Sequence, residues 1–361
     1  MTKKKTVAIL YGGRSVEHAV SVNSARNIFE YLNKTLFEPL PIGISKSGQW
    51  FLTSGVSKEI EEGKPLGLTL NPGNPSLIIL EPGERFNADI IFPVLHGTDG
   101  EDGSIQGLIK AMDLPMVGTS VLGSSLSMNK IVAKRLLRQA GLPVTDFLTF
   151  RFDEKDTISF NSISKKLGLP FMVKSASLGS SVGVTKVKNK KDFKQAVEEA
   201  FKYDDEMLAE EFISGREIEC AVLGNYPPEA SYPGEIVISK KYEFYTFDAK
   251  YVDPEAVRID VPAKLPKAVA TKIRKASIKA YEALHCEDFS RIDLFLDKKG
   301  NIYINEINTI PGFTNSSMYP MMWKERGVSF SDLITRLINL AQQRYDRSKR
   351  IERDFQSALK F

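Results

Sequence analysis

The chain has 361 residues, of which 42% are hydrophobic, 26% charged and 10% aromatic, a composition that excludes disordered, collagen-like and fibrous proteins. At roughly 100–200 residues per domain, this length predicts two or three domains with a sizeable buried core. The formal net charge of +4 is too small to indicate nucleic acid or an anionic membrane as the partner.

Cysteine and histidine are scarce, with two and three residues respectively, which argues against a Cys/His zinc site. Cys220 and Cys286 form no CxxC motif and no disulfide framework, and this favours a reducing cytoplasm as the location. The apolar run VAIL that follows Lys3, Lys4 and Lys5 is shorter than the core of a signal peptide. No stretch approaches about 18 apolar residues, so we expect neither secretion nor a membrane span.

The first third of the chain alternates between strand and helix patterns. The run TVAILYGG (6–13) predicts a strand that ends on two glycines, and apolar residues at helical spacing predict a helix over 16–32. A second apolar run covers 37–45, a Gly- and Pro-rich stretch follows over 63–75, and residues 88–103 predict a strand ending in a polar, glycine-rich loop. This alternation predicts an α/β domain with a mainly parallel sheet over about the first 120 residues, with ligands in the loops after its strands.

A new domain is expected to start near Ser124. The predicted elements that follow are a helix over 129–140 ended by Gly141 and Pro143, two strands within 169–187, a helix over 192–201, strands over 207–213 and 216–224, a helix over 265–284, strands over 290–297 and 301–308, and a helix over 331–344. The charged tail after this last helix is interpreted as a solvated helix without a function.

The clearest chemical signal lies in SRIDLFLD (290–297). Because side chains alternate along a strand, Arg291 and Asp293 share one face, opposite Ile292, Leu294 and Leu296. One face of this strand is therefore expected to be charged and the other to be buried.

The next strand, NIYINEIN (301–308), adds oxygen donors. The same alternation places Glu306 and Asn308 on one face with Ile302 and Ile304. If the two strands form a hairpin, Asp293 converges with Glu306 and Asn308, and three oxygen donors beside an arginine suit Mg²⁺ holding a polyphosphate. Taken alone, a solvent-facing hairpin with ordinary surface charges explains the pattern equally well.

A second signal is the loop Gly179–Gly183, preceded by Lys174. Glycines let backbone N–H groups approach phosphate oxygens, and a lysine adds a positive charge. The chain contains no GxxxxGK[ST] motif, so the loop is not a P-loop, and by itself it is more typical of a plain turn. Gly12 and Gly13 likewise lack the full GxGxxG pattern of a dinucleotide site.

The order of these signals is more specific than any one of them. Lys130, Lys174, the glycine loop, EEFISGRE and the two charged strands together resemble the ATP-grasp enzymes, in which two α+β subdomains clasp ATP and Mg²⁺. Seven blocks between residues 7 and 320 also resemble the D-alanine:D-alanine ligases. In chain order they are VAILYGGRSVEHAVS, LHGTDGEDGSIQG, GTSVLGSSLSMNK, VKSASLGSSVGV, DAKYVDPE, RIDLFLD and NEINTIPGFTNSSMYP.

The resemblance implies a reaction and an architecture. ATP would phosphorylate the carboxylate of one D-alanine, and the amine of a second would attack the acyl phosphate to give D-alanyl-D-alanine for peptidoglycan synthesis. The implied fold is an N-terminal Rossmann-like parallel-sheet domain (1–123), a central ATP-grasp subdomain (124–220) and a C-terminal ATP-grasp subdomain (221–361) with a lid loop around 242–254. The implied cofactors are ATP and two Mg²⁺ ions, or Mn²⁺. We expect a cytoplasmic homodimer that binds neither nucleic acid nor membrane.

The resemblance also implies site residues, by matching motif. The catalytic ones are Glu17, Ser180, Tyr251, Arg291 and Gly312. Those that contact D-alanine are Glu17, His96, Lys250, Arg291, Ser317 and Met318. The ATP-binding ones are Lys130, Lys174, Ser180, Ser181, Glu210, Glu211, Ile213, Glu217, Lys250, Asn305 and Glu306, and the metal ligands are Asp293, Glu306 and Asn308.

Several of these residues carry a specific implied role. Glu17 would hold the ammonium of the first D-alanine, and His96 would lie near a substrate carboxylate. Tyr251 would complete a hydrogen-bonded trio with Glu17 and Ser180, and its presence favours a dipeptide over a D-lactate product. Departures from the family pattern are Leu178, where some members have an acidic residue, and a long segment over 48–82.

Three alternatives remain open at this point. The first is a depsipeptide ligase that takes D-lactate as its second substrate. The second is a module that binds ATP without ligating anything. The third is an ATP-grasp enzyme for another acid and amine, such as a carboxylase or a glutathione-type ligase.

Overall fold

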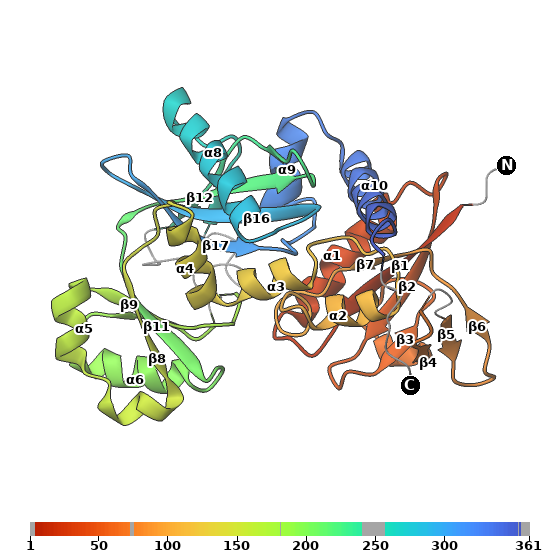
Figure 1. Ribbon diagram of the computed structural model, residues 1–361, viewed down its shortest axis with the longest axis horizontal. Helices are drawn as coiled ribbons and strands as arrows, with labels where there is room; N and C mark the ends of the chain where they lie inside the picture. The colour runs from red at the N-terminus through yellow and green to blue at the C-terminus, as the bar shows by residue number, and fades with distance from the viewer. Residues whose placement is uncertain (1–3, 73–75, 181, 240–256, 353, 355–361) are drawn as a thin grey trace.

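The structure is a computed structural model that describes residues 4–72, 76–180, 182–239, 257–352 and 354. Figure 1 shows an N-terminal domain, a central subdomain and a C-terminal subdomain, each built on its own sheet. The predicted α/β domain followed by two α+β subdomains is confirmed. In the part of the chain that these ranges cover, no helix is long and apolar enough to cross a membrane.

The N-terminal sheet has seven strands in the order β6-β5-β4-β3-β2-β1-β7. β1 (Lys5–Gly12) pairs in parallel with β2 (Phe37–Ile44) and with β7 (Ile90–Pro93), as predicted, but the whole sheet is mixed and not mainly parallel. The other four strands extend the sheet in antiparallel fashion, because short connections allow hairpins and not crossovers. The remaining elements here are α1 (His18–Tyr31), β3 (Trp50–Leu52), η1 (Ile60–Glu62), β4 (Lys64–Thr69), β5 (Ser76–Ile79), β6 (Arg85–Phe86) and α2 (Ser104–Ala111).

The turn after β1 places Glu17 at the start of α1. Gly12 has a φ of +92°, and a Cβ there would lie 2.2 Å from the carbonyl oxygen of Ile44, so only glycine fits. The Gly12 amide donates to the hydroxyl of Ser21 in the first turn of α1, over 2.8 Å. The strand, the turn and the helix are therefore tied together, and Glu17 occupies the N-cap position beyond the end of β1.

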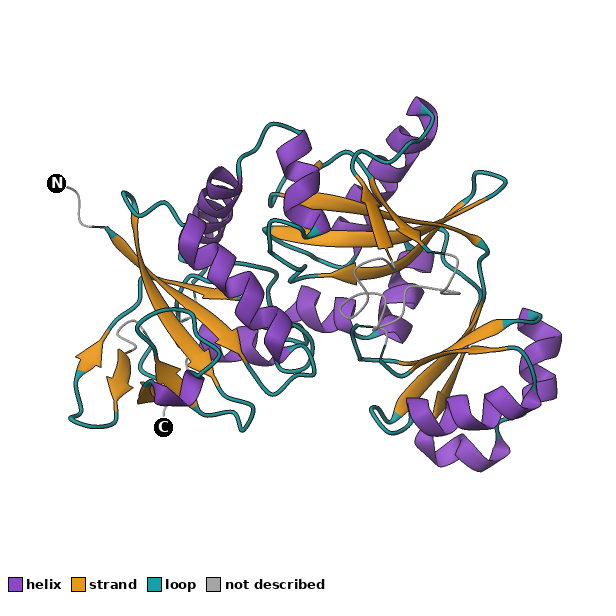
Figure 2. Cartoon of the chain, turned by 180° about the vertical axis from the view of Figure 1, so that it is seen from behind, coloured by secondary structure: helices purple, strands orange, loops and turns teal. Residues whose placement is uncertain are grey.

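The central subdomain has a four-stranded antiparallel sheet in the order β10-β9-β11-β8. Two helices, α5 (Phe160–Leu167) and α6 (Lys190–Ala200), lie on its outer face (Figure 2). The helices α3 (Val121–Met128) and α4 (Lys130–Gln139) precede this sheet. The strands are β8 (Phe147–Arg151), β9 (Phe171–Ser175), β10 (Val184–Val187) and β11 (Glu206–Glu211), and the short 3₁₀-helix η2 (Phe152–Thr157) follows β8.

The C-terminal subdomain has a sheet in the order β15-β14-β12-β16-β17, with β13 paired to β12. Its elements are β12 (Gly215–Leu223), β13 (Glu229–Ala230), β14 (Gly234–Ile238), β15 (Val257–Asp260), α8 (Lys267–Ala283), β16 (Phe289–Asp297), β17 (Ile302–Asn308), α9 (Met318–Glu325) and α10 (Phe330–Ser348). The chain passes from one sheet to the other between β11 and β12. Residue 220, the predicted end of the central subdomain, lies within β12. The prediction places the boundary there because the sequence alone does not show that β11 and β12 join different sheets.

The N-terminal and C-terminal parts share one hydrophobic cluster, which includes Ile90, Phe289 and Leu337. α10 lies against the N-terminal domain in Figure 1. The half-buried guanidinium of Arg344 on this helix donates to the carbonyl oxygens of Met116, at 2.6 Å, and of Gly118, at 2.7 Å. These contacts hold the two parts together, whereas the central sheet has a separate core.

Candidate active site

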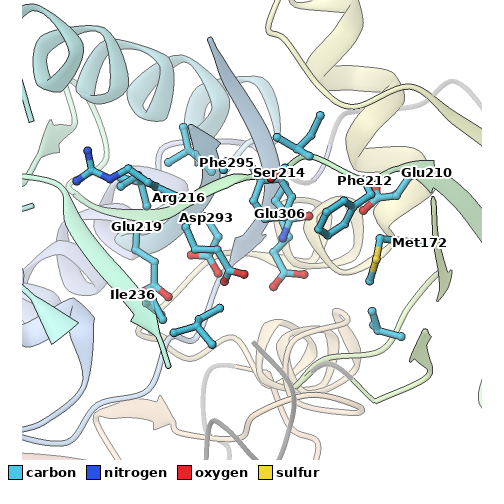
Figure 3. A pocket seen from close by; sticks show the side chains of 18 of the residues that line it. Met172, Glu210, Phe212, Ser214, Arg216, Glu219, Ile236, Asp293, Phe295 and Glu306 are labelled. Carbon is cyan, nitrogen blue, oxygen red and sulfur yellow. The ribbon is translucent and has the colours of Figure 1, made fainter. Parts of the chain in front are cut away.

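A cavity of about 400 Å³ lies between the central and the C-terminal sheets, and Figure 3 shows it from close by. Strands of both sheets and the segment that links β11 to β12 form its walls. Ten residues predicted for the site line this one cavity: Lys130, Lys174, Glu210, Glu211, Ile213, Glu217, Arg291, Asp293, Asn305 and Glu306. The structure therefore brings together most of the residues expected around a nucleotide.

The hairpin of β16 and β17 contains a β-bulge that sequence reasoning missed. Leu294 pairs with Ile304, but Asp293 pairs with Glu306, so β17 has one extra residue at this point. The extra residue shifts the alternation, and Glu306 leaves the face of Ile304 for the face of Asp293. The prediction that Glu306 and Asn308 share a face with the isoleucines is therefore wrong, whereas the predicted convergence on Asp293 is present.

Arg291 is held between two carboxylates on the cavity face. Its Nε and Nη2 donate to the two oxygens of Asp293, both over 2.7 Å. Glu219 on β12 lies 2.9 Å from the same Nε. Burial alone would lower the pKa of Arg291, but Asp293 and then Glu219 raise it well above its usual range. The guanidinium is thus charged and fixed in orientation.

The predicted metal donors are adjacent oxygen-bearing side chains. Asp293 and Glu306 are direct cross-strand partners, and the carboxamide of Asn308 donates to Asp293 over 2.9 Å. Figure 3 shows the carboxylates of Glu219, Asp293 and Glu306 pointing into the same part of the cavity. The described residues contain no group of three His, Cys, Asp or Glu side chains arranged to hold a metal ion. Two carboxylates beside a space for phosphates nevertheless fit Mg²⁺, which takes few protein ligands and completes its shell with water and substrate oxygens.

A buried charge network supports Lys174. Its ammonium pairs with the carboxylate of Glu210, which also lies 2.8 Å from the ammonium of Lys134. The hydroxyl of Thr145 donates to Glu210 over 3.1 Å, and Lys174 donates to the carboxamide oxygen of Asn305 over 3.1 Å. Burial would raise the pKa of Glu210, but Lys134 and Lys174 hold it at about 2. The side chain of Glu210 therefore faces the two lysines.

This network predicts a pH-dependent contribution to stability. The pKa of Glu210 falls from its ordinary 4.5 to about 2 in the folded protein, so its stabilising effect is complete above pH 4.5 and is lost as the pH falls toward 2. We expect the difference in unfolding free energy between the wild type and Glu210→Gln to shrink across this window. Urea unfolding of both proteins at pH values above and within the window measures it. A difference that stays constant with pH would contradict the assignment.

The residues expected around the first D-alanine gather beside the cavity. The hydroxyl of Ser180 donates to a carboxylate oxygen of Glu17, which is 8% exposed. A Cβ added to Gly97 or to Gly179 would lie 2.8 Å or 2.9 Å from the other oxygen of Glu17, so two glycines pack against this carboxylate. Glu17, from the N-terminal domain, thus contacts the glycine loop of the central subdomain.

His96 and the residues after β17 complete the predicted set. Both ring nitrogens of His96 are engaged, Nδ1 with the carbonyl oxygen of Ile310 at 2.8 Å and Nε2 with the hydroxyl of Ser24 at 3.1 Å. A Cβ on Gly312 would lie 3.1 Å from the hydroxyl oxygen of Ser317, so these two predicted residues are neighbours. Asn308, Met318 and Ser317 lie at the end of β17 and the start of α9. Ser181, Lys250, Tyr251 and the predicted lid over 242–254 lie outside the described residues.

The sequence prediction did not include two residues of the site, although the spacing of charged residues indicated each of them. Glu219 follows Glu217 at the period of two that puts both on one face of a strand, and both line the cavity. Lys134 follows Lys130 by one helical turn, on the same face of α4. Neither spacing alone separates a buried role from ordinary surface charge.

Comparison with known proteins agrees with this geometry. A family model described as the N-terminus of D-ala D-ala ligase matches residues 6–119, and one described as its C-terminus matches residues 136–339.

Among curated relatives, a D-alanine–D-alanine ligase of Shouchella clausii is 46% identical over 362 residues, which cover 97% of this chain and 98% of the relative. D-alanine–D-alanine ligase A of Salmonella typhimurium is 45% identical over 355 residues, covering 95% and 97%.

Among solved structures, the D-alanine-D-alanine ligase from Coxiella burnetii aligns with a TM-score of 0.84 at 35% identity, covering 96% of this chain and 98% of that chain. A D-Ala:D-Ser ligase from Enterococcus faecalis aligns with a TM-score of 0.84 at 35% identity, covering 94% of this chain and 100% of that chain.

Proposed function

The chain belongs to the D-alanine–D-alanine ligase family, and we propose that the residues around the cavity carry out its reaction as follows. In this reaction two D-alanines are joined with ATP and Mg²⁺ for peptidoglycan synthesis. The observation that supports these assignments most strongly is the convergence of the Arg291–Asp293 pair, Glu306 and Lys174 on one cavity between two sheets. Positive charge for phosphates and oxygen donors for a cation thus stand side by side, as phosphoryl transfer requires.

ATP is proposed to lie in the cavity. Lys130 and Lys174 neutralise its phosphates, and Ser180 and Ser181, in the loop of the central subdomain, cover them. The backbone of Glu210, Glu211 and Ile213, in the segment that links the two sheets, binds adenine, and Glu217 binds the ribose. A nucleotide in this position contacts both ATP-grasp sheets at once.

Asp293, Glu306 and Asn308 are proposed to hold two Mg²⁺ ions, or Mn²⁺. The bound ions supply charge neutralisation for the phosphates of ATP. Asn305, the neighbour of Glu306 at the bulge, keeps Lys174 beside this donor set through its hydrogen bond of 3.1 Å. The bulge therefore positions both the metal donors and the lysine.

The two D-alanines are proposed to bind at the edge of the cavity. Glu17 holds the ammonium of the first D-alanine. The carboxylate of that D-alanine attacks the γ-phosphorus of ATP, which forms the acyl phosphate and releases ADP. The fork of Arg291 and the amide of Gly312 stabilise the negative charge that develops on the oxygens during both steps. Ser317 and Met318, with Lys250, receive the second D-alanine, whose amine displaces phosphate, and Tyr251 joins Glu17 and Ser180.

A product assay tests this function and its specificity. The purified protein is given ATP, Mg²⁺ and D-alanine, alone and with D-serine or D-lactate, and the products are identified by mass. We expect D-alanyl-D-alanine as the main product in every mixture. A product that contains D-serine or D-lactate would overturn the specificity for D-alanyl-D-alanine. D-serine is the more informative competitor, because the chain is similar to a D-Ala:D-Ser ligase.

Two further properties are proposed on the family resemblance alone. They are a homodimeric assembly and a location in the bacterial cytoplasm. Sedimentation of the purified protein tests the first, and cell fractionation tests the second.

The metal assignment predicts the effect of Glu306→Gln. Removing one of two carboxylates weakens the hold on Mg²⁺, so we expect the Mg²⁺ concentration for half-maximal activity to rise by at least about tenfold. Titration of phosphate release with MgCl₂ measures this concentration. The matched control is Asp297→Asn, a half-exposed carboxylate at the far end of β16, which should leave the titration unchanged. An unchanged titration for Glu306→Gln would remove this residue from the metal site.

A further inference from the structure

Three polar side chains of the N-terminal domain bind the backbone of one loop from the C-terminal subdomain. The carboxylate of Glu101 accepts from the amide of Ile310 over 2.9 Å, and His96 Nδ1 lies 2.8 Å from the carbonyl oxygen of the same residue. The hydroxyl oxygen of Ser24 accepts from the amide of Phe313 over 3.2 Å. Both backbone groups of Ile310 and the amide of Phe313 are therefore held from across the domain boundary.

The hydrogen-bond directions in this set are consistent with one another. A carbonyl oxygen only accepts, so Nδ1 of His96 donates to Ile310, and Nε2 of the neutral ring accepts from the hydroxyl of Ser24. Burial lowers the pKa of His96, which favours this neutral ring. Both ring nitrogens of His96 are thus engaged with the loop and with Ser24, and its implied place near a substrate carboxylate stays a prediction.

Glu101 is itself fixed at its other oxygen. That oxygen accepts from the amide of Gly97 over 2.8 Å, so the carboxylate bridges Gly97 and Ile310. Burial and then the negative charge of Glu17 raise the pKa of Glu101, whereas the amides of Gly97 and Ile310 favour its ionised form by donating to its two oxygens. A carboxyl group kept in surroundings that oppose its charge is more typical of a functional than of a surface position.

The loop that these residues hold carries Gly312. It runs from Thr309 to Phe313, directly after the metal donors of β17, and Gly312 lies between the two anchored residues. We propose that Glu101, His96 and Ser24 are positioning residues that clamp this loop and so set the Gly312 amide opposite Arg291 around the reacting oxygens. The inference rests on the roles proposed for Gly312 and Arg291. A shift of about 1 Å in such a group lowers the rate of the chemical step by up to about 100-fold.

The test compares the change in kcat with the change in the KM for ATP in the variant Glu101→Gln. The amide keeps the size of the side chain but accepts only one of the two N–H bonds, so the clamp loosens while the nucleotide site is untouched. We expect kcat for D-alanine-dependent phosphate release to fall by about 10- to 100-fold, with the KM for ATP within about twofold of wild type. Ser24→Ala, which removes a different anchor of the same loop, should show the same split and keeps the test available if Glu101→Gln folds poorly.

The control is Glu287→Gln, which removes another carboxylate bond across the same domain boundary. Glu287 accepts from the amide of Ser120 over 3.2 Å, away from the loop. We expect it to leave both kcat and KM unchanged. A wild-type kcat in Glu101→Gln and Ser24→Ala, or a loss of kcat matched by an equal rise in the KM for ATP, would overturn the clamp. Formation of the dipeptide by the wild type in the same assay separates this outcome from failure of the proposed function.

Discussion

Replacing Arg291 by alanine or lysine is expected to lower kcat for dipeptide formation by about 100- to 1,000-fold, the loss typical of one preorganised group that stabilises a developing negative charge. The guanidinium is half-buried and is fixed by two bonds to Asp293. A lysine keeps the positive charge but loses the planar fork, so it is not expected to restore the rate. Steady-state phosphate release at saturating ATP and D-alanine measures the effect.

The chain offers a closely matched control in Arg258→Lys. Arg258 donates through Nε and a terminal nitrogen to Asp260, two residues along β15 of the same sheet, in the pattern that Arg291 makes with Asp293. Its side chain is 68% exposed and lies outside the cavity lining. We expect a wild-type kcat in this control. A wild-type rate in Arg291→Lys would show that charge alone is sufficient and would refute the role of the fork.

Replacing Glu210 by glutamine is expected to lower the unfolding free energy by about 3–5 kcal/mol, because it leaves two buried ammonium groups without a counter-ion. The side chains of Glu210 and Lys134 are each 1% exposed, and that of Lys174 is 8% exposed. Burial also lowers the pKa of Lys134, so its charge depends on this carboxylate. Urea unfolding near neutral pH measures the loss, and ATP binding should weaken with it as Lys174 loses its anchor.

Two variants separate this effect from a simple loss of charge. Glu199→Gln removes a carboxylate that pairs with Lys202 on the surface, and we expect little change in stability because exposed pairs contribute little. In the double variant Lys134→Met with Glu210→Gln, one of the two uncompensated ammonium groups is absent, and stability should recover in part. A single variant as stable as wild type, or a double variant less stable than the single, would contradict the network.

The local elements follow from sequence periodicity. The strands over β1, β16 and β17 and the helices α1, α4, α8 and α10 lie where the apolar spacing predicts them. The common face of Arg291 and Asp293 follows from the alternation of side chains along one strand, whose burial switches at every residue from Ser290 to Asp297. These features depend only on neighbours in the chain, so the sequence contains them in full.

The face of Glu306 required the paired strands. Strict alternation puts it with Ile304, and the bulge opposite Asp293 moves it to the cavity. A bulge arises from the pairing of two strands, and no single residue of β17 predicts it. The change of sheet between β11 and β12 is of the same kind, since the two strands are consecutive but pair with different partners.

The contacts that complete the site join residues far apart in the chain. Glu101 and Ile310 are separated by 209 positions. Lys134 reaches Glu210 from α4, and Thr145 reaches it from the segment between α4 and β8. By itself, the sequence determined the strongly periodic secondary elements, the family and the residue types that the chemistry needs. Only the tertiary structure decided which carboxylate meets which ammonium or amide, because such pairings depend on how three sheets pack and on the burial that makes each pairing obligatory.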